Sequence, residues 1–251
     1  VFPVTLIVRD GDNQLVAAWP FFEYAAIGGR GLWVGLSDIA DCMDPLLMRH
    51  DEALLKTVFE ALDQLLADYR FIWIQLLREE WVRDHLEPAL STFPNLPIIR
   101  ERAPNHFVDL TAQSDFESYL NGAVGAKTRK SLRYDTRQLE QLGQTEYVTY
   151  RTPDDLLRFE VEMRSIEKVS WKGRQRVGHL TGVDSGDFFH ELLPKLLVLG
   201  QAEITALRVN QMAIAFEIAI RQPGYYGFFH IAYLPDYHKY APGKQLMLHN
   251  I

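Results

Sequence analysis

The sequence has little of what several common protein classes require. It contains one cysteine, Cys42, which cannot form an intrachain disulfide or build a cysteine-rich metal site. Its longest apolar runs, such as 192–199, are far shorter than the roughly 20 residues that a membrane-spanning helix needs. Residues 1–20 lack the basic, apolar and small-residue order of a secretion leader. We therefore expect a cytoplasmic protein without a membrane span.

Sequence motifs of several enzyme classes are also absent. There is no Gly-x-x-x-x-Gly-Lys-Ser/Thr loop, no Gly-x-Ser-x-Gly turn and no His-Glu-x-x-His pair. The eight histidines show no pairing at metal-ligand spacing, so we expect no metal. The glycine-rich run Gly28-Gly29-Arg30-Gly31 lies between two predicted strands, which is typical of a hairpin loop. Kinase, hydrolase and zinc-enzyme functions therefore lack support.

What is present is the composition of an ordinary globular protein. Of the 251 residues, 47% are hydrophobic and 24% are charged, enough to bury one large core or two modest ones. The net charge of -7 gives the chain no overall attraction to nucleic acid or anionic membrane, so we expect no DNA partner. Val1 lies inside a strand-like run and Ile251 follows a helix that has only begun, so we expect both ends to be truncated.

The two halves of the sequence show overlapping versions of one order of elements. In the first half, the predicted elements are strands at 4–8, 15–24 and 32–36, a helix at 51–69, a strand at 71–77, a helix at 79–93, and strands at 97–100 and 106–110. In the second half, they are helices at 114–120 and 127–142, a strand at 146–151, helices at 152–168 and 187–199, strands at 202–209, 212–220 and 225–234, and a helix starting at 242. This order predicts an α+β fold with two domains, 1–105 and 106–251, each built on a mostly antiparallel sheet flanked by helices.

The sharpest local pattern follows the last predicted strand, where residues 233–246 read Tyr-Leu-Pro-Asp-Tyr-His-Lys-Tyr-Ala-Pro-Gly-Lys-Gln-Leu. Glycine permits close backbone approach, and the free N–H groups of a helix's first turn, aided by its dipole, can hold a diphosphate. A strand-to-helix turn marked by proline and glycine is the alternative interpretation.

This segment resembles the pyrophosphate loop of the GNAT superfamily of acyltransferases, in its CelD/BcsL-like, Fem-related form, and the element order resembles two GNAT folds in tandem. The superfamily places the loop after the third meander strand, as here. The resemblance implies acetyl-CoA or another acyl-CoA as co-substrate, because coenzyme A carries a diphosphate. The residues implied to bind it are Tyr233, Tyr240, Ala241, Pro242, Gly243, Lys244 and Gln245.

Three further stretches are candidates for acceptor binding. The run from Lys127 to Glu140 is similar to the family's Lys-x-Arg-x-x-Leu-Arg helix, in which Arg129 and Arg133 could hold an anionic group or tRNA; a solvated basic face is the alternative. The step 170–173 resembles the family's Ser-Trp-Lys-Gly, where Trp171 offers a rigid surface and Lys172 a movable charge; core packing and solvent exposure are the alternative. In the loop described above, Asp236 and Tyr237 complete the acceptor set.

Candidates for proton transfer lie on the last two predicted strands. Alternation places Glu217 on a face that otherwise carries alanines, and it places His230 with Tyr226 and Phe228. N-acyl transfer from a thioester needs a deprotonated amine and a polarised carbonyl, and the resemblance implies that a backbone N–H of the last meander strand polarises the carbonyl. Glu217 and His230 are therefore our candidates for the general base, although Glu217 could be an exposed strand residue.

Together these features predict an N-acyltransferase that passes an acyl group, most simply acetyl, to an amine of a small molecule, sugar or peptide. The first domain has no pyrophosphate loop, so we expect it to be structural or to shape the acceptor groove. One rival is a Fem-like aminoacyltransferase that uses aminoacyl-tRNA, favoured by the basic helix and opposed by the net negative charge. Another is a GNAT-like protein that only binds a ligand. The acyl length, the acceptor and the oligomeric state are not encoded in any recognisable pattern.

Overall fold

The computed structural model describes residues 2–26, 29–34, 43–49, 51–74, 77–90, 108–111, 114–182 and 185–251. The chain divides into two compact units, Val1–Phe107 and Val108–Ile251. The strand predicted at 97–100 lies outside the described residues, and residues 108–110 do not form a strand. None of the helices in these ranges is long and apolar enough to cross a bilayer.

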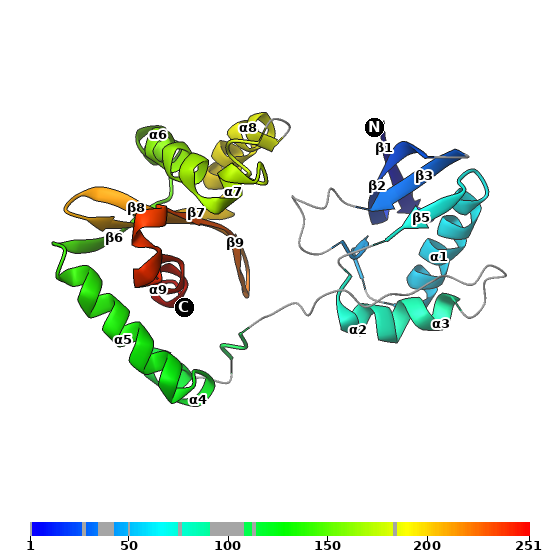
Figure 1. Cartoon of the computed structure of the whole chain (residues 1–251). Helices are drawn as coiled ribbons and strands as arrows, with labels where there is room; N and C mark the ends of the chain where they lie inside the picture. The colour runs from blue at the N-terminus through cyan, green and yellow to red at the C-terminus, as the bar shows by residue number, and fades with distance from the viewer. Residues whose placement is uncertain are drawn as a thin grey trace. The chain divides into compact units, whose positions relative to one another are not determined.

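The first unit contains one mixed sheet (Figure 1). Its strands are β1 (Phe2–Arg9), β2 (Leu15–Ala26), β3 (Gly29–Val34), β4 (Leu46–Leu47) and β5 (Phe71–Trp73). The order is β1-β2-β3-β5, with β4 paired to β2. The first three strands form the predicted antiparallel meander, whereas β3 and β5 are parallel. A parallel pair needs a crossover connection, and helix α1 (Glu52–Leu66) lies between these two strands in the sequence.

Helix α1 covers the core of the first unit. Its N-cap, Asp51, accepts a hydrogen bond from the backbone N–H of Leu54. The apolar side of α1 packs with the sheet and with the helical stretch α2 (Glu79–Trp81), η1 (Val82–Leu86) and α3 (Glu87–Leu90). The Trp81 and Trp19 rings meet edge to face with centroids 5.7 Å apart. These contacts confirm the predicted helices of the first half.

The second unit contains an antiparallel sheet of four strands in the order β6-β7-β8-β9. These strands are β6 (Thr145–Tyr150), β7 (Ala202–Val209), β8 (Met212–Gln222) and β9 (Tyr225–Tyr233). The helices are α4 (Phe116–Ala123), α5 (Ala126–Glu140), α6 (Pro153–Val169), α7 (Trp171–Arg174), α8 (Ser185–Val198), η2 (Pro235–Tyr240) and α9 (Pro242–His249). The predicted order of strand, helices, meander and helix is confirmed, and η2 occupies what was expected to be a loop.

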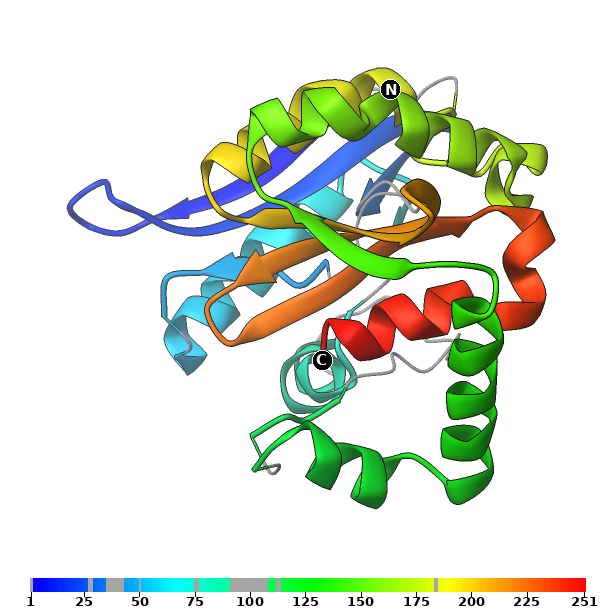
Figure 2. The same cartoon turned by 90° about the vertical axis from the view of Figure 1, so that its left-hand side faces the viewer.

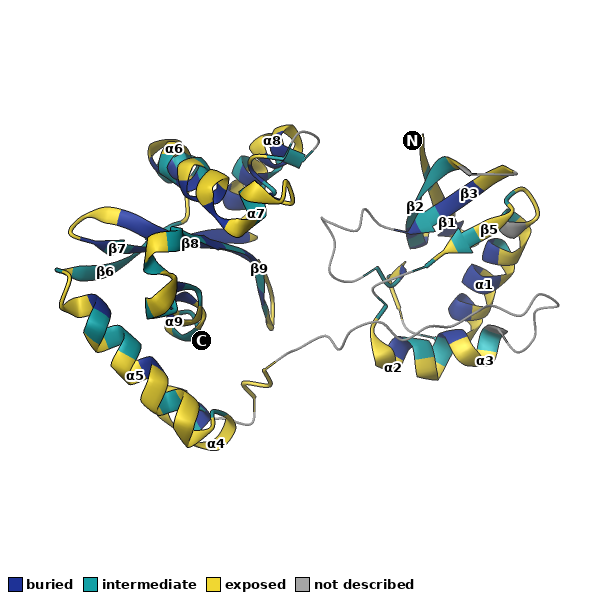
Figure 3. Ribbon diagram, viewed as in Figure 1, coloured by how far each residue is buried: buried dark blue, intermediate teal, exposed yellow. Residues whose placement is uncertain are grey.

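Helices cover both faces of this second sheet. Helices α6 and α8 lie over one face, while α9 crosses the other face and contacts α5 (Figures 1 and 2). The central strands β7 and β8 are therefore buried along most of their length (Figure 3). Strand β9 is an edge strand in the described part of the sheet, so its outer backbone groups have no neighbouring strand there.

The start of α6 gives a test of local stability. Thr152 Oγ1 accepts from the N–H of Asp155 at 3.1 Å, and Asp155 Oδ2 accepts from the N–H of Thr152 at 3.2 Å, which forms a capping box. We expect Thr152→Ala to lower the free energy of unfolding by about 1 kcal/mol in urea titrations, because the N–H of Asp155 loses its acceptor. Ser165→Ala, which removes an exposed hydroxyl from the same helix, is the control. Equal stability of the two variants would contradict a role for this cap.

Candidate active site

A change of register between β8 and β9 decides which side chains share a face. Ile218 pairs with His230, but Ala219 pairs with Phe228, so Phe229 has no partner on β8. Such a bulge changes the alternation of side chains along the strand. The prediction that His230 shares a face with Tyr226 and Phe228 is therefore wrong.

The consequence is that Glu217 and His230 lie on opposite faces of the sheet. His230 lies on the side of α6, where its ring centroid is 5.9 Å from that of Phe216. Glu217 lies on the side of α9, where Asn250, one residue beyond the helix, contacts its carboxyl group. The two predicted catalytic groups therefore belong to separate clusters, each beside edge strand β9.

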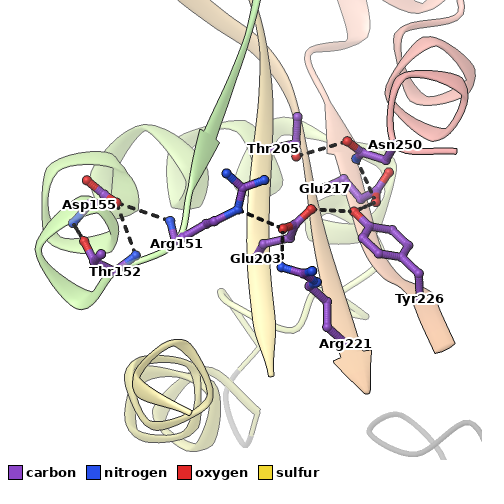
Figure 4. A network of polar contacts seen from close by, with 9 residues as sticks. All are labelled: Arg151, Thr152, Asp155, Glu203, Thr205, Glu217, Arg221, Tyr226 and Asn250. Carbon is purple, nitrogen blue, oxygen red and sulfur yellow. Dashed lines mark hydrogen bonds and ion pairs between the residues drawn. The ribbon is translucent and has the colours of Figure 1, made fainter. Parts of the chain in front are cut away.

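Glu217 is fully buried within a polar network (Figure 4). Its Oε1 accepts from Asn250 Nδ2 at 3.1 Å and lies 3.3 Å from the hydroxyl of Tyr226. Asn250 also accepts from Thr205 Oγ1 at 3.3 Å. Glu217 Oε2 has no hydrogen-bond partner among the described residues. A buried carboxylate with one unsatisfied oxygen favours its neutral form.

The neighbouring Glu203 is held differently. Its Oε2 accepts from Arg151 at 3.1 Å and from Arg221 at 3.0 Å, while its Oε1 lies 3.2 Å from the hydroxyl of Tyr226. That hydroxyl has a single proton to share between two carboxyl groups. Both guanidinium groups balance the charge of Glu203. If one of the two carboxyl groups takes up a proton, it is therefore Glu217. Burial, together with the charge of Glu203, raises the pKa of Glu217 to about 7 against the lowering effect of its hydrogen bonds.

The raised pKa of Glu217 gives a stability prediction with a defined sign. A carboxyl group whose pKa rises from 4.5 to about 7 on folding costs stability as the pH increases between these values, by on the order of 3 kcal/mol. We expect Glu217→Gln to remove this loss, so that the variant gains stability relative to the native chain between pH 4.5 and pH 8. Urea unfolding at both values measures it. The exposed Glu117→Gln is the control, and a pH-independent difference for Glu217→Gln would disprove the shift.

On the other face, α6 supplies a buried carboxylate that the sequence analysis did not single out. Glu167 is fully buried and accepts from the N–H of Leu180 at 3.0 Å and from both the N–H and the hydroxyl of Thr181 at 2.6 Å. His230 Nε2 lies 2.6 Å from Glu167 Oε1. Although burial opposes ionisation, the hydrogen bonds from His230, Thr181 and Leu180 lower the pKa of Glu167 to about 2.

An ionised Glu167 fixes the state of His230. Since Glu167 has no proton to give, Nε2 must carry the hydrogen and Nδ1 must accept one. Lys172 Nζ lies 3.1 Å from Nδ1 and is the donor. Burial lowers the pKa of His230, as does the charge of Lys172, against the opposite effect of Glu167. Each ring nitrogen therefore has a polar group within 3.1 Å, which argues against His230 as a free general base.

The step at 170–173 positions Lys172 through backbone contacts. Ser170 is buried at the end of α6, donates to the carbonyl of Glu167 at 2.7 Å and accepts from the N–H of Gly173. Gly173 approaches α6 so closely that a Cβ atom would lie 2.4 Å from the Glu167 carbonyl oxygen. Trp171 is 48% exposed, so it is not a core residue. The motif thus turns Lys172 towards β9 and leaves Trp171 at the surface.

Gly173 is the residue of this step whose replacement should cost most. We expect Gly173→Ala to destabilise the second unit by about 1–3 kcal/mol, because the added methyl meets backbone oxygens that cannot move aside. The matched control is Gly125→Ala, where a Cβ would meet nothing within 4 Å. Urea unfolding measures both. A Gly173 variant as stable as its control would exclude the close approach.

In the predicted acyl-CoA loop, residues 233–246, some backbone N–H groups donate to protein carbonyls and others do not. Ala241 has a left-handed conformation (φ 49°), and its N–H donates to the carbonyl of His238. The N–H of Gln245 donates to the carbonyl of Ala241. Within the described ranges, the N–H groups of Gly243 and Lys244 have no protein acceptor. The first turn of α9 therefore offers two adjacent donors to an anion.

The side chains of this loop divide into structural and accessible ones. Gln245 is buried, donates to the carbonyl of Tyr240 at 2.7 Å and accepts from Tyr147. These contacts hold the loop in place, and the contact of Gln245 with the donor stays a prediction. The aromatic residues of the loop pack beneath it against the core of the second unit; they are Tyr233, Tyr237 and Tyr240. Pro242 is buried and begins α9, while Asp236 and Lys244 are exposed. Gly243 lies against β9, where its Cβ position is 3.3 Å from Ile231.

The two arginines predicted on α5 have different surroundings. Arg129 Nη1 donates to the carbonyls of Leu120 and Asn121 at the end of α4 and to that of Val124. Arg129 therefore holds α4 against α5 through Nη1, and its role at the acceptor stays a prediction. Arg133 is exposed, and its role stays a prediction.

Comparison with known proteins is informative for the second unit. Residues 126–251 match the protein family described as the acetyltransferase (GNAT) domain. No curated protein matches the chain. Among solved structures, the chain is similar to the C-terminal domain (DUF2156) of a putative lysylphosphatidylglycerol synthetase from Agrobacterium fabrum. That similarity has 15% identity and a TM-score of 0.52, covers 98% of this chain and 66% of the other, and concerns the fold alone.

Proposed function

The chain belongs to the acetyltransferase (GNAT) domain family, and on that premise we propose that its second unit transfers an acyl group from acyl-CoA to an amine. The acceptor is a small molecule, a sugar or a peptide. The observation that carries the proposal is the pair of unpaired N–H groups, Gly243 and Lys244, where edge strand β9 passes through η2 into α9. Two adjacent donors at the positive end of a helix suit the diphosphate of coenzyme A.

The edge position of β9 suits the remainder of the donor. Acyl transfer needs a hydrogen-bond donor that stabilises the tetrahedral oxyanion as the amine attacks the thioester carbonyl. The outer side of β9 has no neighbouring strand in the described part of the sheet, and the bulge at Phe229 redirects the backbone there. A thioester lying along this edge would have a polarising N–H and the clusters of Glu217 and His230 beside it.

The first unit fits the proposal as a diverged copy of the second. Both contain an antiparallel three-stranded meander, β1-β2-β3 and β7-β8-β9. After β3, the chain forms β4 and α1, and no described segment there carries a Pro-Gly helix start like that at Pro242. We therefore assign donor binding to the second unit and a structural or acceptor-shaping role to the first.

A second candidate donor is aminoacyl-tRNA. The fold shared with a domain of a putative lysylphosphatidylglycerol synthetase, whose named product is an aminoacylated lipid, favours aminoacyl transfer. Exposed basic residues on α5, including Lys130, Arg133 and Arg137, could contact phosphates. The net charge of -7 opposes RNA binding by bulk electrostatics. We therefore place acyl-CoA first.

Ligand-dependent melting separates the two donors. A ligand present at a hundred times its dissociation constant stabilises the folded protein by about 2.7 kcal/mol. We expect acetyl-CoA or a longer acyl-CoA to raise the melting temperature, and tRNA to leave it unchanged. A shift with tRNA and none with any CoA species would reject acyl-CoA as the donor.

A charge reversal at the helix start locates the binding. Lys244→Glu places a negative side chain beside the two free N–H groups and should lower affinity for CoA about tenfold. Lys127→Glu, an equal charge change at the exposed start of α5, is the matched control and should bind as the native chain does. Equal loss in both variants would point to bulk charge rather than to the start of α9.

A further inference from the structure

We propose that Lys172 is the group that takes the proton from the acceptor amine, and that Glu167 and His230 are positioning residues that hold it at edge strand β9. The inference rests on the proposed function and names a base within it. It assigns a role to Glu167, which the sequence pattern left without one, and a different role to His230.

The geometry forms a directed chain of three groups. His230 Nε2 lies 2.6 Å from Glu167 Oε1, and Lys172 Nζ lies 3.1 Å from His230 Nδ1. Lys172 is half-buried, so it lies between the buried His230 and the surface. It lies at the level of the exposed Trp171, with Nζ 5.9 Å from the centroid of that ring.

The buried end of this chain of groups, the carboxylate of Glu167, is fixed by the backbone around it. Between α7 and α8, the segment that carries Leu180 and Thr181 wraps the Glu167 carboxylate with three donors. Gly178 makes this possible, because a Cβ there would lie 2.5 Å from Glu167 Oε2. A carboxylate enclosed in this way cannot rotate, so the tautomer of His230 and the direction of the Lys172 hydrogen bond are set in advance.

Lys172 suits the role better than the two predicted bases do. Glu217 is fully buried beneath α9, and the two ring nitrogens of His230 lie against Glu167 and Lys172. Lys172 is only half-buried, and in the described part of the second unit no carboxylate is ion-paired with it. A base must reach the proton it removes, and of the three only Lys172 has an exposed side.

Burial, rather than the surrounding charges, shifts Lys172 towards its neutral form. Burial lowers the pKa of Lys172, and the charge of Glu167 acts in the opposite direction. The titratable groups facing it are Glu167 from α6, His230 from β9 and, behind His230, His179, whose ring centroid is 4.7 Å from that of His230. Only Glu167 among these is negative, and its charge is already satisfied by its own donors.

The proton balance is simple. The acceptor ammonium gives a proton to the neutral Lys172 amine, and the resulting free amine forms a C–N bond with the thioester carbonyl. Collapse of the tetrahedral intermediate breaks the C–S bond, and the CoA thiolate takes the proton from the Lys172 ammonium. The second proton of the attacking nitrogen goes to solvent. The net products are an amide, CoA thiol and one proton.

The first test measures the titration of Lys172 directly. Trace labelling with acetic anhydride between pH 6 and pH 11, followed by peptide mass spectrometry, gives the reactivity of each lysine in one sample. We expect Lys172 to titrate at lower pH than the exposed Lys168 and Lys195. Glu167→Gln should shift it lower still, because the nearby negative charge is lost. A Lys172 that titrates with the surface lysines, or does not respond to Glu167→Gln, overturns the proposal.

If Glu167→Gln fails to fold, the native chain still decides the geometry. Nitrogen-15 NMR of labelled histidine should show the neutral form of His230 as the Nε2–H tautomer, with a titration midpoint below that of a free histidine. An Nδ1–H tautomer, or a midpoint above that of a free histidine, would contradict the proposed geometry.

The second test measures turnover as CoA thiol release from acetyl-CoA with a panel of primary amines. Lys172→Met should lower kcat/KM by about 10²- to 10⁴-fold, and Lys172→Arg should fail equally because a guanidinium keeps its proton. Lys168→Met is the matched control. Retained turnover in Lys172→Arg would mean that the residue holds an anion, and a loss in Glu217→Gln alone would return the base to Glu217.

The outcomes separate the two proposals. Acetyl-CoA could neither shift the melting curve nor be turned over while Lys172 still titrates at lower pH than the surface lysines. In that case the acyl-CoA assignment fails, and the arrangement of Glu167, His230 and Lys172 stands as a property of the site. If acetyl-CoA binds and is turned over but Lys172→Met is as active as Lys168→Met, the function stands and the role of Lys172 is overturned.

Discussion

The second unit depends on how it satisfies carboxylates inside a sheet that is covered on both faces. Ionised groups in such a place must be paired or fully hydrogen-bonded, and otherwise they take up a proton. Glu167 stays ionised, because Leu180 and Thr181 supply three hydrogen-bond donors and His230 Nε2 lies 2.6 Å away. Glu217 takes up a proton instead, because the two guanidinium groups nearby, those of Arg151 and Arg221, contact Glu203. The ionised carboxylate of Glu167, on α6, therefore lies against one face of the sheet, and the titrating carboxyl group of Glu217 lies on the other.

Edge strand β9 connects these clusters to the predicted donor site. Its bulge at Phe229 separates the environments of Glu217 and His230, and its end leads through η2 to the free amides of α9. A thioester along this edge would meet an oxyanion donor, a phosphate site and a proton acceptor on one continuous stretch of chain. All of these residues lie within 126–251, the range that matches the family.

Much of the secondary structure followed from local signals in the sequence. The helices predicted at 51–69 and 152–168 and the close pair of strands predicted at 202–209 and 212–220 each depend on neighbouring residues only, and the structure has α1, α6, β7 and β8 at these places. Register was less predictable, because one unpaired residue reverses every later side chain, and nothing about Phe229 in the sequence marks it as that residue. A signal for Glu167 did exist: it is the lone acid among the buried positions of α6.

The sequence by itself determined the α+β class, the order of helices and strands, the glycine-marked start of α9 and the resemblance to an acyltransferase family, because propensity, capping and periodicity act over a few residues. Only the tertiary structure decided which carbonyls Arg129 and Gln245 contact, that Glu167 lies beside His230, and that Lys172 meets His230 across 58 positions of sequence. These roles depend on hydrogen bonds between distant segments, and such partners are fixed only when the two faces of the sheet are packed.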